Sequence, residues 1–460
     1  MTGKYTGKRY YVLGLAASGG AVARYLAQEG ATVYAWDDGL ASREAFLRNA
    51  GDAFALVRPA DAPWSELDGV VPSPGVPLTH PAPHEAITLA KRHRRPIFCD
   101  VDFLYMRYPR AIFVGVTGSN GKSTVTALIA HIMRESGRDA YEAGNIGVPA
   151  AEIVPRDPEN ACFVVECSSF QLDLCAVFAP RVSVWTNISP DHLDRHGDVA
   201  GYVRAKERLF LRQGATDVAV IGTDDADSRD VAARVAAREN APRVTFISSG
   251  VPPRGGGYGY RGTALIDDKG EAVCDLADVP AFAGRHMRQN AAAAAAACAA
   301  LGVSAQAIDA GLRSFAPLPH RMERVCESFG ATFVNDSKAT NAASTLEALS
   351  AFPRCRWIAG GKAKGDDLSV LMEYKRHILC AYLIGESQEK FAAILDKAYV
   401  PFVRSGTLES AMRAAFAEAK RDVEPSTILL SPACASYDQW KNFEERGAFF
   451  RDLANALAKT

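Results

Sequence analysis

The chain has 460 residues, with 52 Lys and Arg against 53 Asp and Glu, so its formal net charge is −1. Hydrophobic residues make up 48% of the chain, which excludes a mainly disordered protein. At about 150 residues per domain the length predicts about three domains. Nucleic-acid binders usually carry a basic excess, so we expect no nucleic-acid partner.

No stretch reaches the ~18 continuous apolar residues that a membrane-spanning helix needs. Arg24 and Glu29 interrupt the apolar run near the N-terminus, which argues against a secretory signal. The cysteines form no CxxC pair and no metal-type spacing, a pattern typical of reduced thiols. We therefore expect a cytoplasmic protein without membrane insertion.

The first hundred residues alternate strands and helices. Residues 10–15 (YYVLGL) and 32–36 (TVYAW) predict strands, and residues 19–29 between them have helical spacing. This order predicts a parallel sheet with helices on its faces. The segment 71–77 (VPSPGVP) predicts a loop. We expect this first domain, of Rossmann-like α/β type, to span residues 1–107.

A second α/β domain is expected at 108–317. It begins with a strand at 111–116, and its strands at 163–166 and 182–186 are mostly apolar, as suits strands buried on both faces. The segment 251–257 (VPPRGGG) predicts a flexible surface excursion.

The third α/β domain is expected at 318–460 and is again Rossmann-like. It alternates helices with strands at 356–359, 381–384 and 427–430. The sequence thus predicts an α/β protein of three domains, the central one carrying a mononucleotide-binding P-loop.

The strongest motif is TGSNGKST at 117–124, which follows a strand and opens a helix. Its glycines let backbone N–H groups turn towards phosphate oxygens, and the start of the helix adds a favourable dipole. Lys122 can reach the β- and γ-phosphates, and the hydroxyl of Ser123 or Thr124 can bind Mg²⁺. The alternative is a glycine-rich turn with an exposed lysine, because the loop meets the GxxxxGK[ST] spacing only loosely.

Candidate metal ligands follow the neighbouring strands. Glu166 ends a strand and is well placed to hold Mg²⁺, although an isolated glutamate there is more often a solvated strand end. The cluster DHLD at 191–194 follows a third strand and is a candidate for a second metal through His192. Lys206, taken alone, is interpreted as a solvated helix lysine.

Eight segments together resemble one family. They are TGSNGKST (117–124), GNIG (144–147), ECSSFQL (166–172), NISPDHLDRH (187–196), AKERL (205–209), LPHRMERV (318–325), NDSKATN (335–341) and SPACASYDQWKNFEERG (431–447). Through them the chain resembles the ATP-dependent Mur ligases of peptidoglycan synthesis, whose three-domain architecture is shared with folylpolyglutamate synthases. The last three segments, with SPGVP (73–77), are most similar to the members that add D-glutamate to UDP-N-acetylmuramoyl-L-alanine.

The resemblance implies that ATP phosphorylates the carboxylate of the UDP-linked substrate and that the amine of D-glutamate attacks the acyl phosphate. It implies a monomer that uses two Mg²⁺ ions, one held by Ser123 and Glu166 and the other by His192 and carbamylated Lys206. The implied catalytic residues are Lys122, His192 and Lys206. The implied ATP contacts are Gly118, Asn120, Gly121, Lys122, Ser123, Thr124, Asn290, Arg321 and Asp336.

The resemblance also assigns the two other substrates. The UDP substrate is assigned to Gly14, Ser18, Gly19, Asp37, Asp38, Ser73, Pro74, Gly75 and Asn145. D-Glutamate, with its two carboxylates, is assigned to Lys338, Thr340, Lys364, Ser436 and Phe443. Two departures stand out. Ala16 occupies a position where a dinucleotide site favours glycine, and Met287 stands where asparagine is commoner in the family.

Two alternative functions stay open. One is another ligase of the same superfamily, against which the compact first domain and the long C-terminal motif argue. The other is a non-catalytic nucleotide-binding regulator or dinucleotide-linked sensor, which leaves the DHxD cluster and Lys206 unexplained.

Overall fold

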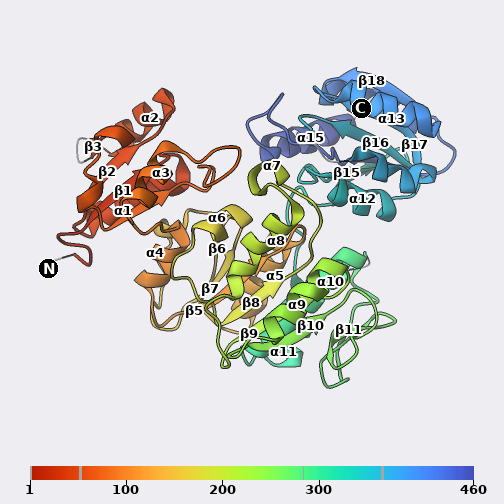
Figure 1. Cartoon of the computed structure of the whole chain (residues 1–460). Helices are drawn as coiled ribbons and strands as arrows, with labels where there is room; N and C mark the ends of the chain where they lie inside the picture. Colours follow the sequence, from red (N-terminus) through yellow and green to blue (C-terminus); the bar gives the residue numbers. More distant parts are fainter. Residues whose placement is uncertain (1–2, 51–53, 283, 364–366, 460) are drawn as a thin grey trace. The chain divides into compact units, whose positions relative to one another are not determined.

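The computed structural model describes residues 3–50, 54–282, 284–363 and 367–459 (Figure 1). It divides into two compact units, Met1–Phe315 and Ala316–Thr460. Both units contain largely parallel sheets accompanied by helices, so the α/β prediction is confirmed. The finer division of the first unit at residue 107 stays a prediction, although that unit contains two separate sheets.

The first sheet has four parallel strands in the order β3-β2-β1-β4. The strands are β1 (Arg9–Leu13), β2 (Thr32–Trp36), β3 (Ala55–Leu56) and β4 (Gly69–Pro72), and the helices are α1 (Ala17–Gln28), α2 (Leu40–Ala50), α3 (Glu85–Arg92) and α4 (Asp100–Arg107). Tyr11 and Val12 of β1 are fully buried, because this central strand has helices or loops on both faces. The carboxyl ends of β1 and β4 therefore lie side by side.

The second sheet has nine strands in the order β13-β12-β11-β10-β9-β8-β5-β7-β6. The strands are β5 (Ile112–Thr117), β6 (Ala140–Gly144), β7 (Cys162–Glu166), β8 (Val182–Trp185), β9 (Val218–Gly222), β10 (Arg243–Ile247), β11 (Gly257–Arg261), β12 (Ala264–Ile266) and β13 (Ala272–Asp275). The helices are α5 (Lys122–Glu135), α6 (Ser169–Leu174), α7 (Leu193–His196), α8 (Val199–Glu207), α9 (Ala226–Ala236), α10 (Arg285–Ala300) and α11 (Ala305–Ser314). Strand β5 lies between β7 and β8, so the chain segments that follow these three strands converge at one edge.

The segment 251–257 was predicted to be a flexible surface excursion. That prediction was wrong for its last residue, which belongs to a strand. Gly257 begins β11, which pairs with β10 and opens the antiparallel extension β11-β12-β13. A Cβ atom on Gly257 would lie 2.5 Å from the carbonyl oxygen of Phe246, and one on Gly259 would lie 2.6 Å from Pro252. Glycine is needed here for close backbone approach, a role that composition alone does not distinguish from a loop.

The second unit contains one six-stranded sheet in the order β14-β15-β19-β16-β17-β18, parallel except for β14. The strands are β14 (Glu323–Ser328), β15 (Ala331–Asn335), β16 (Cys355–Gly360), β17 (Ile378–Ile384), β18 (Phe402–Gly406) and β19 (Ser426–Leu430). The helices are α12 (Ala342–Ala351), α13 (Gln388–Ala398), α14 (Leu408–Ala419) and α15 (Phe443–Leu457), with a 3₁₀ segment at Leu368–His377.

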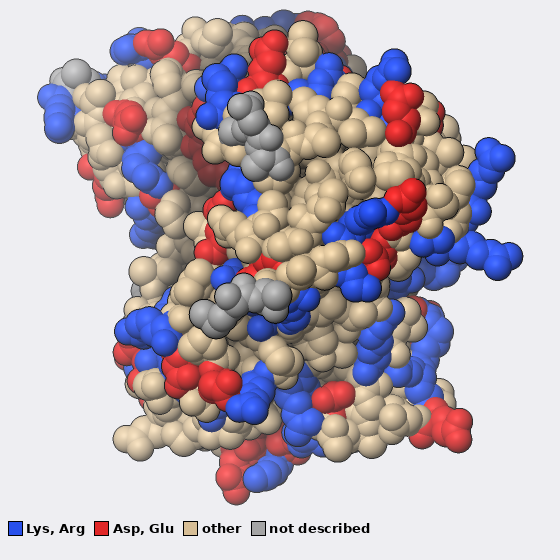
Figure 2. Space-filling model, turned by 90° about the vertical axis from the view of Figure 1, so that its left-hand side faces the viewer, with Lys and Arg blue, Asp and Glu red and all other residues tan. Residues whose placement is uncertain are grey.

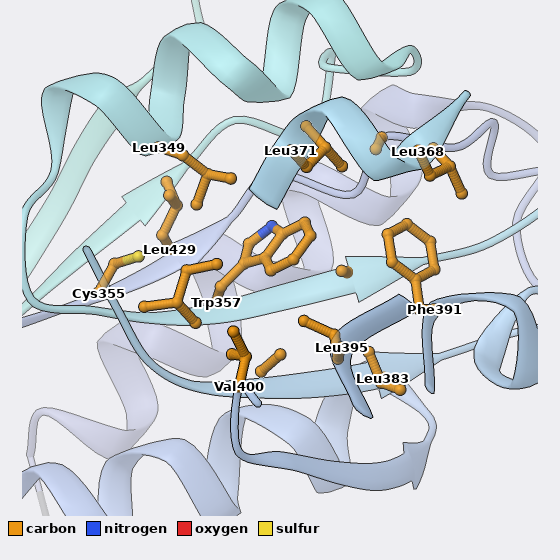
Figure 3. Close-up of a cluster of buried hydrophobic side chains, with 14 of the residues drawn as sticks. Leu349, Cys355, Trp357, Leu368, Leu371, Leu383, Phe391, Leu395, Val400 and Leu429 are labelled. Atoms are coloured by element: carbon orange, nitrogen blue, oxygen red, sulfur yellow. The ribbon is translucent and has the colours of Figure 1, made fainter. Parts of the chain in front are cut away.

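The core on one side of this sheet surrounds Trp357 of β16 (Figure 3). The indole is fully buried, and its Nε1 donates a hydrogen bond to the carbonyl oxygen of Ser431 at 2.7 Å. The hydroxyl of Ser431 donates in turn to Asp336 at 2.8 Å. The core thus supports the loop that carries a candidate ATP residue.

We expect Trp357→Phe to lower the free energy of unfolding by about 1–3 kcal/mol, because it removes both buried volume and a donor to the Ser431 carbonyl. Denaturant titration measures the change. Trp440→Phe is the control, since the Nε1 of half-buried Trp440 has no hydrogen-bond partner among the described residues. An equal loss in both variants would contradict the role given to the Trp357 hydrogen bond.

The surface agrees with the balanced composition. Figure 2 shows Lys and Arg interspersed with Asp and Glu over one face of the molecule. No helix in the described part of the chain is both long and apolar enough to cross a membrane. Eight of the ten cysteines are buried.

Candidate active site

The loop after β5 is shaped for close contacts. Gly118 and Gly121 have φ angles of 142° and 85°, which residues with a side chain rarely adopt. A Cβ atom on Gly118 would lie 2.0 Å from Thr186 Oγ1, and one on Gly121 would lie 2.3 Å from Asn290 Oδ1. The structure therefore brings together the glycine loop, the buried start of α5 at Ser123 and Thr124, and Asn290.

A polar network holds this loop against the start of α10. Asn187 Oδ1 accepts from the backbone N–H of Asn120 at 3.0 Å, and Asn187 Nδ2 donates to Gln289 Oε1 at 2.9 Å. Gln289 Nε2 donates to Asp224 at 2.8 Å. Sequence reasoning missed Gln289 and Asp224, although Gln289 lies directly before Asn290 in the chain. The network fixes the backbone that would surround a nucleotide.

Two lysines bind the same carbonyl oxygen of this loop. Lys122 Nζ donates to the carbonyls of Gly118 at 2.9 Å and Ser119 at 2.8 Å, and Lys206 Nζ donates to that of Gly118 at 2.7 Å. Lys206 is 1% exposed, which excludes the interpretation as a solvated helix lysine. Its ammonium lies 4.5 Å from the centre of the Tyr202 ring.

The environment of Lys206 favours the neutral amine. Burial lowers the pKa of Lys206 well below its ordinary value, and the positive charge of Lys122 lowers this pKa further. The carboxylates of Asp191 and Glu166 act in the opposite direction without reversing the shift. A neutral amine is a nucleophile, so Lys206 is suited to covalent modification.

Glu166 is the carboxylate best suited to a cation. It ends β7 and is 2% exposed. Its Oε1 accepts from Asn145 Nδ2 at 2.9 Å, whereas its buried Oε2 has no hydrogen-bond partner among the described residues. A buried carboxylate oxygen without a donor is costly unless a cation or water binds it. The residues present therefore fit a Mg²⁺ ion at Glu166.

His192 lies on a strained backbone at the start of α7. Its φ angle is 53°, and Asp191 Oδ2 is 3.6 Å from its Nε2. Within the described ranges, no three His, Cys, Asp or Glu side chains gather as a ready metal site. A second cation near His192 would therefore need oxygen ligands of another kind, such as a modified Lys206 or a substrate.

The candidate UDP site lies at the carboxyl ends of β1 and β4. Gly14 has a φ angle of 86°, and its carbonyl oxygen accepts from Ser73 Oγ at 3.0 Å. No side-chain hydrogen bond caps the start of α1 at Ala16, so the first N–H groups of that helix, at Ser18 and Gly19, suit an anion. The structure thus joins Gly14, Ser18, Gly19 and Ser73 at one edge.

The two acidic residues after β2 have different environments. Asp37 accepts from the backbone N–H groups of Leu15 at 2.7 Å and Gly39 at 2.8 Å, so its carboxylate shapes the loop. Asp38 is mostly exposed, and its Oδ2 is 3.0 Å from His84 Nε2. Contact of either with uridine stays a prediction.

In the second unit, the side chain of Asp336 is hydrogen-bonded to the backbone of the residue that follows Arg321. Asp336 Oδ1 accepts from the N–H of Met322, the neighbour of Arg321, at 3.2 Å. Glu323 accepts from the N–H of His320 at 2.8 Å and from Arg451 at 3.0 Å, which fixes the same turn. Although burial raises the pKa of Glu323, these hydrogen bonds hold it below its ordinary value.

The residues assigned to D-glutamate are also in the second unit. The ammonium of Lys338 lies 4.9 Å from the centre of the Phe443 ring, and the N–H of Thr340 donates to the Lys338 carbonyl at 2.9 Å. Ser436 is buried in the segment that follows Cys434. Lys364 lies outside the described residues.

Sequence reasoning missed Arg446, whose hydrogen bonds connect the segments that carry the residues assigned to D-glutamate. It is 1% exposed, and burial lowers its pKa to about 10. Its Nη2 donates to the carbonyl oxygens of Ser337 at 2.8 Å and Cys434 at 3.2 Å. Arg446 lies at the end of the SPACASYDQWKNFEERG segment. The neighbouring residues in the sequence do not indicate that this arginine is buried.

Comparison with known proteins identifies relatives over nearly the whole chain. The model of the Mur ligase middle domain matches residues 116–298. The UDP-N-acetylmuramoylalanine--D-glutamate ligase of Rhizobium meliloti (strain 1021) is 45% identical over 98% of this chain and 97% of its own length. The protein of the same name from Caulobacter vibrioides (strain NA1000 / CB15N) is 43% identical over 98% of this chain and 96% of its own.

Among solved structures, a pseudomurein peptide ligase type C from Methanothermus fervidus has the same fold. It superposes with a TM-score of 0.56 at 16% identity, covering 98% of this chain and 100% of its own.

Proposed function

The chain belongs to the Mur ligase family, and on this premise we propose that it adds D-glutamate to UDP-N-acetylmuramoyl-L-alanine with the hydrolysis of ATP. The observation that carries the proposal is identity of 45% to a relative of that named activity, over nearly the full length of both chains. The two lysines on the glycine loop, half-buried Lys122 and buried Lys206, support it independently, because such a loop suits a triphosphate.

The proposed reaction has two steps. An oxygen of the L-alanyl carboxylate attacks the γ-phosphorus of ATP, the bond from that phosphorus to the β,γ-bridging oxygen breaks, and ADP leaves. The amine of D-glutamate then attacks the acyl carbon, phosphate leaves, and the nitrogen loses a proton to form the amide. In the first step the carboxylate attacks the γ-phosphate, which is also anionic. The site must therefore neutralise charge and hold the reacting groups in line.

We assign that neutralisation to a few residues of the first unit. Lys122 turns from the carbonyls of its own loop to the phosphates, while Gly118, Asn120 and Gly121 shape the backbone around them. Mg²⁺ held by Ser123 and Glu166 would screen the phosphate oxygens, and a second ion would be held by His192 and carbamylated Lys206. The remaining proposed ATP contacts are Thr124, Asn290, Arg321 and Asp336.

The low pKa of Lys206 supports its carbamylation. The neutral amine nitrogen attacks the carbon of CO₂, a C–N bond forms, and one proton is released to solvent. The product is an anionic carbamate whose oxygens are hard ligands of the kind that Mg²⁺ prefers. A buried lysine is thereby converted from a repulsive neighbour of a cation into a ligand.

The other two substrates are proposed to bind where the sequence assigned them. Backbone N–H groups at Ser18 and Gly19 suit the diphosphate of the UDP substrate. Lys338 supplies a positive charge for a D-glutamate carboxylate in the second unit. We also propose that the protein acts in the cytoplasm as a monomer, since its substrates are soluble precursors and one chain carries all the proposed contacts.

The test is the choice of acceptor. With UDP-N-acetylmuramoyl-L-alanine and ATP present, we expect D-glutamate to stimulate phosphate release about 100-fold more than L-lysine, diaminopimelate or tetrahydrofolate. Equal turnover with another acceptor would favour a different ligase of the superfamily. Nucleotide binding without acceptor-dependent turnover would favour the regulator.

A further inference from the structure

Arg195, in the short helix α7, is a buried cation that the carboxylates of Asp173 and Asp194 attract and whose side-chain hydrogen bonds go to backbone oxygens. It is 8% exposed, and its guanidinium donates to the carbonyl of Val76 and, at 3.4 Å, to those of Pro74 and Gly75. No other hydrogen-bond acceptor for its side chain occurs among the described residues. A desolvated guanidinium is costly unless its donors are bound, so its position depends on the loop 73–77.

The loop 73–77 is bonded to both sides of the proposed UDP site. At its start, the N–H of Ser73 donates to the carbonyl of Leu13 at 2.7 Å, next to Gly14. At its end, the carbonyl of Pro77 accepts from the N–H of His84 at 3.0 Å, and the ring of His84 contacts Asp38. A ligand that moves this loop must therefore also act on Arg195.

Arg195 fixes the orientation of a peptide group in that loop. In a trans peptide the C=O and the following N–H point in opposite directions. Since the Pro74 carbonyl points to Arg195, the N–H of Gly75 points away from it. A Cβ atom on Gly75 would meet no atom within 4 Å, so the loop has open space at Gly75 for a ligand.

On its other side, Arg195 is linked to His192. The guanidinium lies 5.1 Å from the centre of the Phe170 ring, and that ring lies 4.9 Å from the His192 ring in an edge-to-face arrangement. The backbone N–H of Arg195 also donates to the carbonyl of His192 at 3.0 Å. A shift of Arg195 therefore changes the contacts of both the ring and the backbone of His192.

We propose that Arg195 is a positioning residue that couples occupancy of the UDP-substrate site to the geometry of His192. Binding of the UDP substrate fixes the loop 73–77, the loop fixes Arg195, and Arg195 fixes His192 for a divalent cation. This inference rests on the proposed function, because it takes the UDP substrate and the cation from it.

The test compares binding of Mn²⁺, followed by its electron paramagnetic resonance signal, with and without UDP-N-acetylmuramoyl-L-alanine. In the unsubstituted protein we expect the substrate to tighten Mn²⁺ binding by about 5-fold or more, a usual size for coupling between sites. In Arg195→Met we expect this factor to fall to about 1, and the KM for the UDP substrate to rise about 10-fold with a smaller change in KM for D-glutamate.

Arg238→Met is the matched control. Arg238 lies in the same unit and also donates to three backbone carbonyls, those of Phe210, Leu211 and Gln213, but it does not bind the loop 73–77. It is expected to keep the full coupling factor, even if its melting temperature falls as much as that of Arg195→Met. Arg195→Lys, which keeps the charge but lacks the planar fork, should retain only part of the coupling and serves if the Met variant unfolds.

The outcomes separate the two hypotheses. A substrate that binds without tightening Mn²⁺, or a coupling factor that Arg195→Met and Arg195→Lys leave unchanged, overturns the role of Arg195. Failure of the unsubstituted protein to bind UDP-N-acetylmuramoyl-L-alanine overturns the proposed function instead.

Discussion

Replacing Lys206 with alanine is expected to lower the rate of D-glutamate-dependent phosphate release by about 10³-fold, the loss typical of removing a group that stabilises developing charge. The proposed carbamate supplies anionic oxygen ligands beside a phosphate that is being transferred. Alanine leaves a small cavity next to Gly118 and Tyr202, where Lys206 now lies. Acetate or formate can enter that cavity and present carboxylate oxygens, so we expect either to restore part of the lost rate.

The measurement is phosphate release at constant ionic strength, with chloride replacing acetate in the control series. Lys269→Ala removes an exposed lysine of the same unit and should keep the full rate without any effect of acetate. Full activity in Lys206→Ala, or a loss that neither carboxylate relieves, would contradict the carbamate as a ligand.

The parts of this site that follow from local sequence were predictable. A strand, a glycine loop and a helix are encoded in consecutive residues, and the structure places the loop and the helix start as the TGSNGKST motif indicates. The positions of Glu166 and His192 after neighbouring strands followed from the rule that parallel strands end at one edge. These are the features for which the nearest residues in the chain supply most of the physical constraint.

The remaining features depend on contacts between distant residues. The residues next to Lys206 in the sequence indicate a solvated helix lysine. Only its hydrogen bond to Gly118, 88 positions away, shows that it is buried. Arg446 is buried by its bonds to Ser337, which is 109 positions away. Arg195 meets the loop 73–77 across about 120 positions. Periodicity and composition describe local environment, so they carry no information about which distant carbonyl a side chain will reach.

Lys122→Met tests whether Lys122 and Lys206 act together. We expect phosphate release to fall by about 10²–10³-fold, because the charge that meets the phosphates is lost. Acetate should not restore it, since the methionine side chain leaves no empty ligand position at Lys206. This difference from Lys206→Ala separates a phosphate contact from a metal ligand.

The same variant has a second consequence for Lys206. Burial is the main cause of the low pKa of Lys206, and the charge of Lys122 lowers it further, so removing that charge raises the pKa. Only the neutral amine reacts with CO₂. In Lys122→Met, carbamate formation at a given pH should therefore decrease, and its midpoint should move to higher pH. Nuclear magnetic resonance of the protein in ¹³C-bicarbonate across a pH series measures this directly. An unchanged midpoint would mean that burial alone sets the state of Lys206, whereas a shift to lower pH would contradict the repulsion between the two ammonium groups that share the Gly118 carbonyl.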